Sequence, residues 1–158
     1  MSDLLNRLQA SVGKEFVFKA QYPIGHAPIR QYALSLENFN PLYSDSAFAK
    51  AHGLRDVMAP PTFICDSWQY FGGDIDERGE LLGRHELRDL VGLRAGNDYE
   101  FFQPVHPDDT ITAKWRVLDV AVKEGRSGKT IFQNFEVTFY NQRDELLAKS
   151  IEMMFHRG

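Results

Sequence analysis

The segment 38–45, with the sequence NFNPLYSD, gathers the polar side chains of Asn38, Asn40, Tyr43 and Asp45 in eight residues. Chemistry that moves a proton needs a group that accepts or donates one near neutral pH. The neutral amide of Asn38 cannot accept a proton, and a phenol with a pKa near its reference value of about 10 is a poor general base. Asn and Pro are also common turn residues, so a purely loop-ordering role for this segment stays open.

The remaining candidate groups are expected to have structural roles. Asp66 lies in a strongly apolar stretch, where we interpret it as a hydrogen-bonded structural carboxylate, with a displaced acid as the alternative. Cys65 has no base nearby in the sequence and is expected in the core. The histidines show no metal-ligand spacing, and GRSGK (125–129) is too short for a phosphate-binding loop. We therefore expect no metal and no cofactor.

Composition narrows the class of protein. The chain has 158 residues, which favours one domain over residues 1–158, and its formal net charge is -4. A mildly acidic chain without a basic block argues against nucleic acid as a partner. With one cysteine, no internal disulfide can form. We find neither a signal-peptide core nor a membrane span, and expect a cytoplasmic protein that does not bind a membrane.

Helices and one strand are expected in the first half of the chain. Leu4, Leu5 and Leu8 indicate a helix over 2–10, and the alternation of Phe16 and Phe18 indicates a strand. A short helix is expected over 29–36. Segment 45–53 has Asp45 as an N-cap and Gly53 as a stop. Segment 59–73 predicts a buried helix with its prolines in the first turn and Gly72-Gly73 at its end.

Three strands are expected in the second half. Over 109–120, one face is predicted to hold Ile111, Ala113, Trp115 and Val117. Over 129–140, it is Ile131, Phe135, Val137 and Phe139. Over 147–155, it is Leu147, Ile151, Met153 and Phe155. An antiparallel sheet with one covered face, wrapped around a buried helix, is an α+β arrangement.

Four segments together resemble a known family: IRQYALSLENFNPLYSD, GLRDVMAPPTF, AGNDYEFFQPVHPDDTITAKWRV and GRSGKTIFQNFEVTFYNQ. They are similar to the hotdog-fold MaoC-like dehydratases, especially the N-terminal half of fungal-type fatty-acid-synthase dehydratases and mesaconyl-CoA hydratase-like proteins. The resemblance covers most of the chain in the family's order and is weaker over 74–90. It implies a curved antiparallel sheet around a central buried helix.

The resemblance also implies where a catalytic site would lie, and three positions depart from the family pattern. Active members carry Asp-x-Asn-Pro-x-His in the loop, whereas this chain has Asn38 and Tyr43 at the acid and histidine positions. A glycine N–H that polarises the thioester carbonyl is replaced at Pro61, which has no N–H. The same matching implies substrate-binding residues, which are Asn40, Ala59, Pro60, Thr62, Phe63 and Trp68.

Three functions follow as alternatives. The first is a non-catalytic subunit that binds the acyl-CoA substrate within a heteromeric (R)-type enoyl-CoA hydratase or dehydratase. The second is a self-sufficient homodimeric hydratase or thioesterase that uses Asp45, Asp66 or His85 instead. The third is a non-enzymatic acyl-thioester-binding module. The resemblance favours an acyl-CoA ligand under all three and implies a second hotdog subunit. We predict that helix 61–71 and the strand faces around Phe101, Trp115 and Phe135 line or back an apolar channel.

Overall fold

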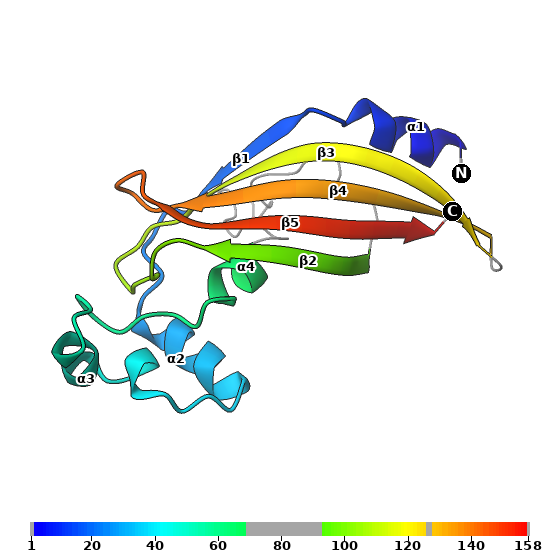
Figure 1. The fold of residues 1–158 in the computed structure, drawn as a ribbon. Helices are drawn as coiled ribbons and strands as arrows, with labels where there is room; N and C mark the ends of the chain where they lie inside the picture. The colour runs from blue at the N-terminus through cyan, green and yellow to red at the C-terminus, as the bar shows by residue number, and fades with distance from the viewer. Residues whose placement is uncertain (1, 69–92, 126–127, 158) are drawn as a thin grey trace.

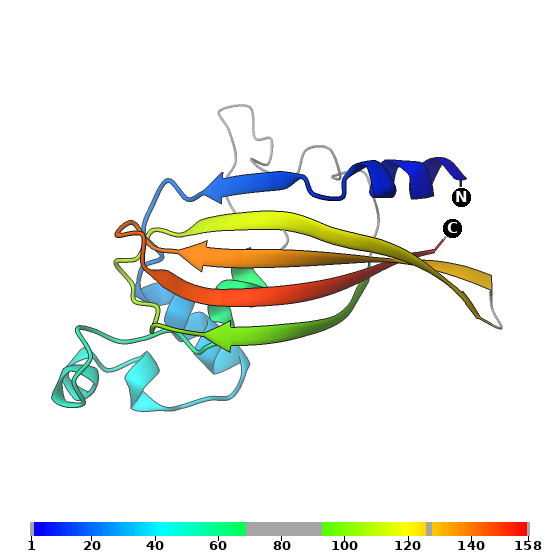
Figure 2. The ribbon, with the colours of Figure 1, turned by 45° about the horizontal axis from the view of Figure 1, so that its top comes forward.

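Five antiparallel strands form one sheet in the computed structural model, which describes residues 2–68, 93–125 and 128–157 (Figure 1). The strands are β1 (Glu15–Lys19), β2 (Leu93–Phe101), β3 (Thr112–Gly125), β4 (Gly128–Tyr140) and β5 (Leu146–Arg157). Their order across the sheet is β1-β3-β4-β5-β2, so β1 and β2 lie at its edges. The sheet is curved and does not close on itself, as Figure 2 shows from a second direction.

The predicted inner faces of β3 and β4 are confirmed. Ala113, Trp115 and Val117 are buried, as is Ile111 just before the strand. The matching face of β4 is buried as well, and it holds Ile131, Phe135, Val137 and Phe139. The rings of Trp115 and Phe135 meet edge to face with their centroids 5.7 Å apart. These alternating side chains are the centre of the hydrophobic core.

The predicted face of β5 is wrong. Residues that pair directly across two strands point to the same face, and the register places Ser150 opposite Val137 and Glu152 opposite Phe135. The inner face of β5 is therefore Ala148, Ser150, Glu152, Met154 and His156, all buried. Ile151, Met153 and Phe155 lie on the outer face. Leu147 is buried at the start of the strand. The strand carries apolar residues on both faces, so apolar periodicity alone assigned the wrong one.

The helices are α1 (Ser2–Ala10), α2 (His26–Ser35), the 3₁₀ turn η1 (Pro41–Tyr43), α3 (Ser46–Ala51) and α4 (Phe63–Trp68). α2, η1 and α3 lie together beyond one end of the sheet, and α4 lies between them and the sheet (Figure 1). Asp45 caps α3 as predicted, and Gly53 has the left-handed φ of 83° that follows the helix. No helix in residues 2–68, 93–125 and 128–157 is long and apolar enough to cross a membrane.

The helix predicted over 59–73 differs at its start. It begins at Phe63, and the prolines form the turn before it, in which the Phe63 N–H donates to the Pro60 carbonyl over 2.9 Å. Phe63, Ile64 and Cys65 are buried as expected. The side chain of Trp68 and the predicted end at Gly72-Gly73 lie outside the described residues.

A buried carboxylate, Asp109, joins three separate segments at this end of the sheet. Its side chain is 0% exposed. One oxygen accepts from Arg55 Nη2 over 2.8 Å and from Arg143 Nη2 over 2.9 Å. Asn141 Nδ2 donates to the same oxygen, and the His106 N–H donates to the other over 2.8 Å. Because a buried charge is costly without partners, these donors make the burial of Asp109 possible.

We predict that Asp109→Ala lowers the free energy of unfolding by about 3 kcal/mol, because it removes the buried acceptor that Arg55 and Arg143 share and that also accepts from the His106 N–H. Urea denaturation measures the change. Asp108→Ala is the matched control, since Asp108 is 61% exposed although it also pairs with Arg55 over 2.8 Å, and it should cost less than about 1 kcal/mol. Equal losses for the two variants would contradict the assigned role of Asp109.

Candidate functional site

The amide groups of the loop 38–45 are used within the loop itself. Asn38 Oδ1 accepts from the Asn40 N–H over 3.2 Å, and Asn40 Oδ1 accepts from the Leu42 N–H over 3.0 Å, which caps η1. The Asn38 N–H donates to the Ala33 carbonyl over 2.9 Å, which ties the loop to α2. Asn38 and Asn40 are exposed, and Tyr43 is half-buried. The two amides thus hold the loop in shape, the alternative that the sequence had left open.

A second carboxylate, Asp56, joins this loop region to the rest of the molecule. It accepts from Ser46 Oγ over 2.5 Å and from the Val57 N–H over 2.8 Å, and His26 Nε2 lies 3.1 Å from its other oxygen. The Ser46 hydrogen bond, together with the Val57 N–H and His26, lowers the pKa of Asp56 to about 2, against the opposing effect of burial. Asp56 therefore connects the starts of α2 and α3 through its ionised form.

Segment 57–62 connects the loop to the end of the sheet. The Met58 N–H donates to the Leu42 carbonyl over 3.0 Å, and the Ala59 N–H donates to the Val105 carbonyl over 2.8 Å. His106 Nδ1 lies 2.8 Å from the Val57 carbonyl oxygen. This segment therefore lies between η1 and the connection from β2 to β3, with backbone hydrogen bonds to both.

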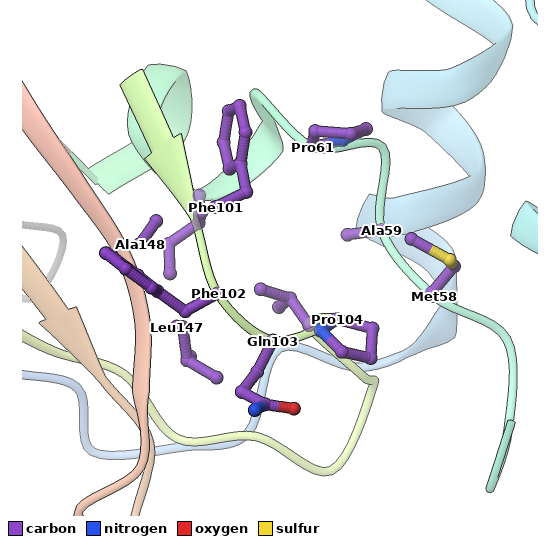
Figure 3. A pocket seen from close by; sticks show the side chains of 11 residues that line it. Met58, Ala59, Pro61, Phe101, Phe102, Gln103, Pro104, Leu147 and Ala148 are labelled. Carbon is purple, nitrogen blue, oxygen red and sulfur yellow. The ribbon is translucent and has the colours of Figure 1, made fainter. Parts of the chain in front are cut away.

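A cavity of about 230 Å³ lies beside this segment. Figure 3 shows Met58, Ala59 and Pro61 on one side of it and Leu147 and Ala148 of β5 on the other. The remaining lining residues are Ile64, Phe101, Phe102, Gln103, Pro104 and Val105. Gln103 is the one polar side chain in this set, so the cavity suits an apolar ligand rather than a charged one.

The predicted substrate-binding residues fall into two groups. Ala59 lines the cavity, beside Pro61, which was predicted as a degenerate catalytic position and not as a binding residue. Thr62 Oγ1 lies 3.0 Å from the hydroxyl of Tyr32, and the Phe63 ring meets the Tyr32 ring edge to face at 5.3 Å, so both join α4 to α2. Pro60 is buried before α4. The side chain of Trp68 lies outside the described residues.

The cavity brings together only part of the set formed by the catalytic-loop positions and the predicted channel aromatics. Phe101 lines the cavity, whereas Trp115 and Phe135 pack against each other in the core. Asn38, Asn40 and Tyr43 are not lining residues, and the Leu42–Met58 hydrogen bond is what connects their loop to the cavity wall. Sequence reasoning missed Met58, Phe102 and Leu147. The adjacent pair Phe101-Phe102 at the end of a strand was the available signal, because alternation cannot bury two neighbours on one face.

No group of three histidine, cysteine, aspartate or glutamate side chains in the described part of the chain is arranged to hold a metal ion. Cys65 is a buried cysteine in the core cluster, as the sequence indicated.

Comparison with known proteins places this geometry among dehydratases. Residues 10–150 match the model of the FAS1-like, dehydratase domain region. A UPF0336 protein from Saccharopolyspora erythraea is 40% identical over 143 residues, which cover 90% of this chain and 87% of that protein. The "Probable enoyl-CoA hydratase alpha subunit" of Thermomonospora curvata is 27% identical over 158 residues. The match covers 92% of this chain but only 49% of that subunit.

Solved structures share the fold. The C terminal truncated HadBC (3R-hydroxyacyl-ACP dehydratase) complex from Mycobacterium tuberculosis aligns with a TM-score of 0.69 at 17% identity, over 92% of this chain and 96% of that one. The MaoC-like dehydratase from Rhodospirillum rubrum aligns with a TM-score of 0.66 at 18% identity, over 93% and 94% of the two chains. At such identities the likeness concerns the fold.

We predict that stability in acid reflects the ionisation of Asp56. Its pKa in the folded chain, about 2, lies below the ordinary value of 3.8, so its contribution is present above about pH 4 and is lost as the pH falls toward 2. Asp56→Asn should lower the free energy of unfolding by about 1 kcal/mol at pH 6, a figure reduced for partial exposure. Chemical denaturation from pH 6 to pH 2 should show the two proteins converging, and a constant difference would contradict this assignment.

Proposed function

The chain belongs to the FAS1-like dehydratase domain family, with the hotdog fold of the MaoC-like dehydratases, and from this we propose that it is an acyl-thioester-binding, non-catalytic subunit of a heteromeric (R)-type enoyl-CoA hydratase or dehydratase. The observation that carries the proposal is the state of the loop 38–45. Its amide oxygens accept hydrogen bonds from the loop's own backbone, and neither Asn38 nor Tyr43 is suited to proton transfer at neutral pH.

Hydration of an enoyl thioester requires a group that takes a proton from water and a group that delivers a proton to carbon. Asn38 and Tyr43 occupy the two loop positions where the family places an acid and a histidine. A neutral amide does neither task, and a phenol is a poor general base at neutral pH. Loss of a positioned acid–base group typically lowers the rate by about 10²–10⁴-fold. The residue types at these two loop positions therefore favour a subunit that leaves proton transfer to a partner.

The cavity supplies the binding part of the proposal. Its wall includes Pro61, which cannot donate a backbone hydrogen bond to a thioester carbonyl, and the floor residues Ile64, Leu147 and Ala148 are almost fully buried. Such a cavity fits the hydrocarbon end of an acyl group rather than its reacting end.

The relatives support a subunit role. The similar protein of Thermomonospora curvata is named as an alpha subunit, and the similar fold in HadBC belongs to a complex. One of these names specifies a CoA thioester and the other an ACP thioester, so the proposed ligand is an acyl thioester of either carrier. The two relatives thereby agree on the subunit role and differ in the carrier.

The second candidate function, a self-sufficient hydratase or thioesterase, needs a replacement acid or base. Asp45 is poorly suited because its Oδ1 accepts from the Ala47 and Phe48 N–H groups over 2.9 and 3.0 Å as the cap of α3. The side chain of Asp66 and residue His85 lie outside the described residues.

The third candidate function is a binding module without any enzymatic partner. It would use the same cavity, but no assembly that contains this chain would show hydratase activity.

We predict that the purified chain alone hydrates a 2-enoyl-CoA at least about 10³-fold more slowly than a typical enzyme turnover of about 10 s⁻¹. Loss of the enoyl thioester absorbance measures the rate. Asn38→Ala should change this residual rate by less than about twofold, because the amide moves no proton. Ordinary turnover by the isolated chain, abolished by Asn38→Ala or Tyr43→Phe in a folded protein, would instead establish the self-sufficient enzyme.

We predict that hexanoyl-CoA binds at least about tenfold more tightly than acetyl-CoA, because four further methylene or methyl groups enter the cavity. Isothermal titration calorimetry measures both affinities without turnover, since these thioesters are saturated. Met58→Trp should weaken hexanoyl-CoA binding by at least about tenfold by filling the cavity mouth. Met153→Trp, on the outer face of the sheet, is the matched control and should have no effect. Equal binding of both thioesters would falsify the acyl-binding role of this cavity.

A further inference from the structure

The cavity beside segment 57–62 has a buried part and an exposed rim. Three lining residues are almost completely buried: Ile64, Leu147 and Ala148. Four lining residues are exposed and form what is here called the rim: Pro61, Phe101, Phe102 and Gln103. Because removing hydrocarbon from water is favourable, an acyl chain that enters this cavity places its tail in the buried part. The thioester at the other end of the chain then lies at the rim.

Gln103 brings a polar side chain to this rim. Its backbone N–H donates to the Leu147 carbonyl over 3.3 Å, whereas its side-chain amide makes no hydrogen bond within the described part of the chain. Figure 3 shows this side chain on the side of the cavity away from Pro61. An exposed side chain changes rotamer rapidly, so the amide can turn to a ligand group at the rim. It can then present N–H donors or its carbonyl acceptor to that group.

Backbone donors around the rim are already used by the fold. The Phe102 N–H donates over 2.9 Å to the same carbonyl that accepts from the Gln103 N–H. On the other wall, the Ala59 N–H donates to the Val105 carbonyl over 2.8 Å. Pro61 has no N–H to offer. A carbonyl oxygen at the rim can therefore be met by the side-chain amide of Gln103 rather than by these backbone groups.

We propose that the side-chain amide of Gln103 donates a hydrogen bond to the carbonyl oxygen of a bound acyl thioester. The cavity then prefers a thioester to a ligand that has the same hydrocarbon chain but no carbonyl. This inference rests on the proposed function, because it concerns the same cavity and adds the residue that recognises the thioester. Gln103 is a specificity residue in this role, since a neutral amide moves no proton near neutral pH.

The contact also decides which part of the ligand stays accessible. With the tail beside the buried Ile64 and the carbonyl at Gln103, the double bond next to the carbonyl of an enoyl chain lies at the rim. Phe101 is 45% exposed there, so the rim is open to another molecule. Groups that move protons can reach the double bond from outside this chain, whereas a double bond in the buried part would be out of reach.

The test compares two ligands that differ only at the carbonyl. Hexyl-CoA is a thioether that has a methylene group where hexanoyl-CoA has its carbonyl, and both carry the same pantetheine and phosphates. The ratio of their dissociation constants therefore isolates the contribution of the carbonyl. Isothermal titration calorimetry on the full chain measures both constants. We expect the wild type to bind hexanoyl-CoA about three- to tenfold more tightly, the range that one hydrogen bond typically gives.

Substitutions at Gln103 separate the donor from the size of the side chain. Gln103→Leu and Gln103→Glu both remove the N–H donors at similar volume, and each should bring the ratio of the two constants to about one. Gln103→Arg keeps N–H donors and should keep the preference, because any added attraction for the CoA phosphates cancels in the ratio. Gln9→Leu is the matched control. Gln9 is exposed on α1, at the other end of the sheet (Figure 1), and its variant should keep the wild-type ratio.

Thermal denaturation checks that every variant is folded. A wild-type ratio near one, or a preference that survives in both Gln103→Leu and Gln103→Glu, would overturn the carbonyl contact while the acyl-binding role of the cavity stands. An equal loss of affinity for both ligands in Gln103→Leu would assign the amide to the pantetheine instead, and would overturn the contact as well. If neither ligand binds the wild-type chain, the proposed function fails and this inference fails with it.

Discussion

The buried charge of Asp109 is the interaction on which the arrangement of the site depends. A carboxylate with no exposed surface is tolerated only because Arg55, Arg143, Asn141 and the His106 N–H all donate to it. These donors come from segments far apart in the sequence. Their shared acceptor holds the segment before α4, the connection from β2 to β3 and the turn between β4 and β5 in one place. Two of these three segments contribute walls of the cavity.

Under the proposed function, the candidate site separates binding from proton transfer. The cavity is apolar and lies between β5, the end of β2 and the segment before α4. The loop that would carry an acid and a base in related dehydratases lies on the far side of that segment and is connected to it by the Leu42–Met58 hydrogen bond. Its amides stabilise its own turn. The proposed division of labour between two subunits would account for both features, because the partner would supply the acid and base that this loop lacks.

The two faces of the sheet differ in the kind of side chain that they carry. The inner face of β3 and β4 is apolar and packs into the core, whereas the outer face carries alternating charges from one edge to the other. The inner face of β5 departs from this division, since it places Ser150 and Glu152 beside Val137 and Phe135. Charge on the outer face costs little because water reaches it.

Local interactions determined much of the fold from sequence alone. The cap of Asp45 on α3 and the left-handed residue Gly53 involve neighbours within a few positions, so their residue types were sufficient to predict them. Alternation likewise assigned the faces of β3 and β4. The absence of an acid and a base at Asn38 and Tyr43 was visible once the family resemblance located the loop.

Only the tertiary structure decided the features that depend on pairing between distant segments. The register with β4 turned Glu152 inward and Met153 outward, although the apolar pattern of β5 indicated the reverse. The junction at Asp109 joins residues 34 and 54 positions away, and Met58, Phe102 and Leu147 meet at the cavity only after the chain has folded. Side-chain type and local spacing carry no information about such contacts, because strand register and the packing of loops fix them.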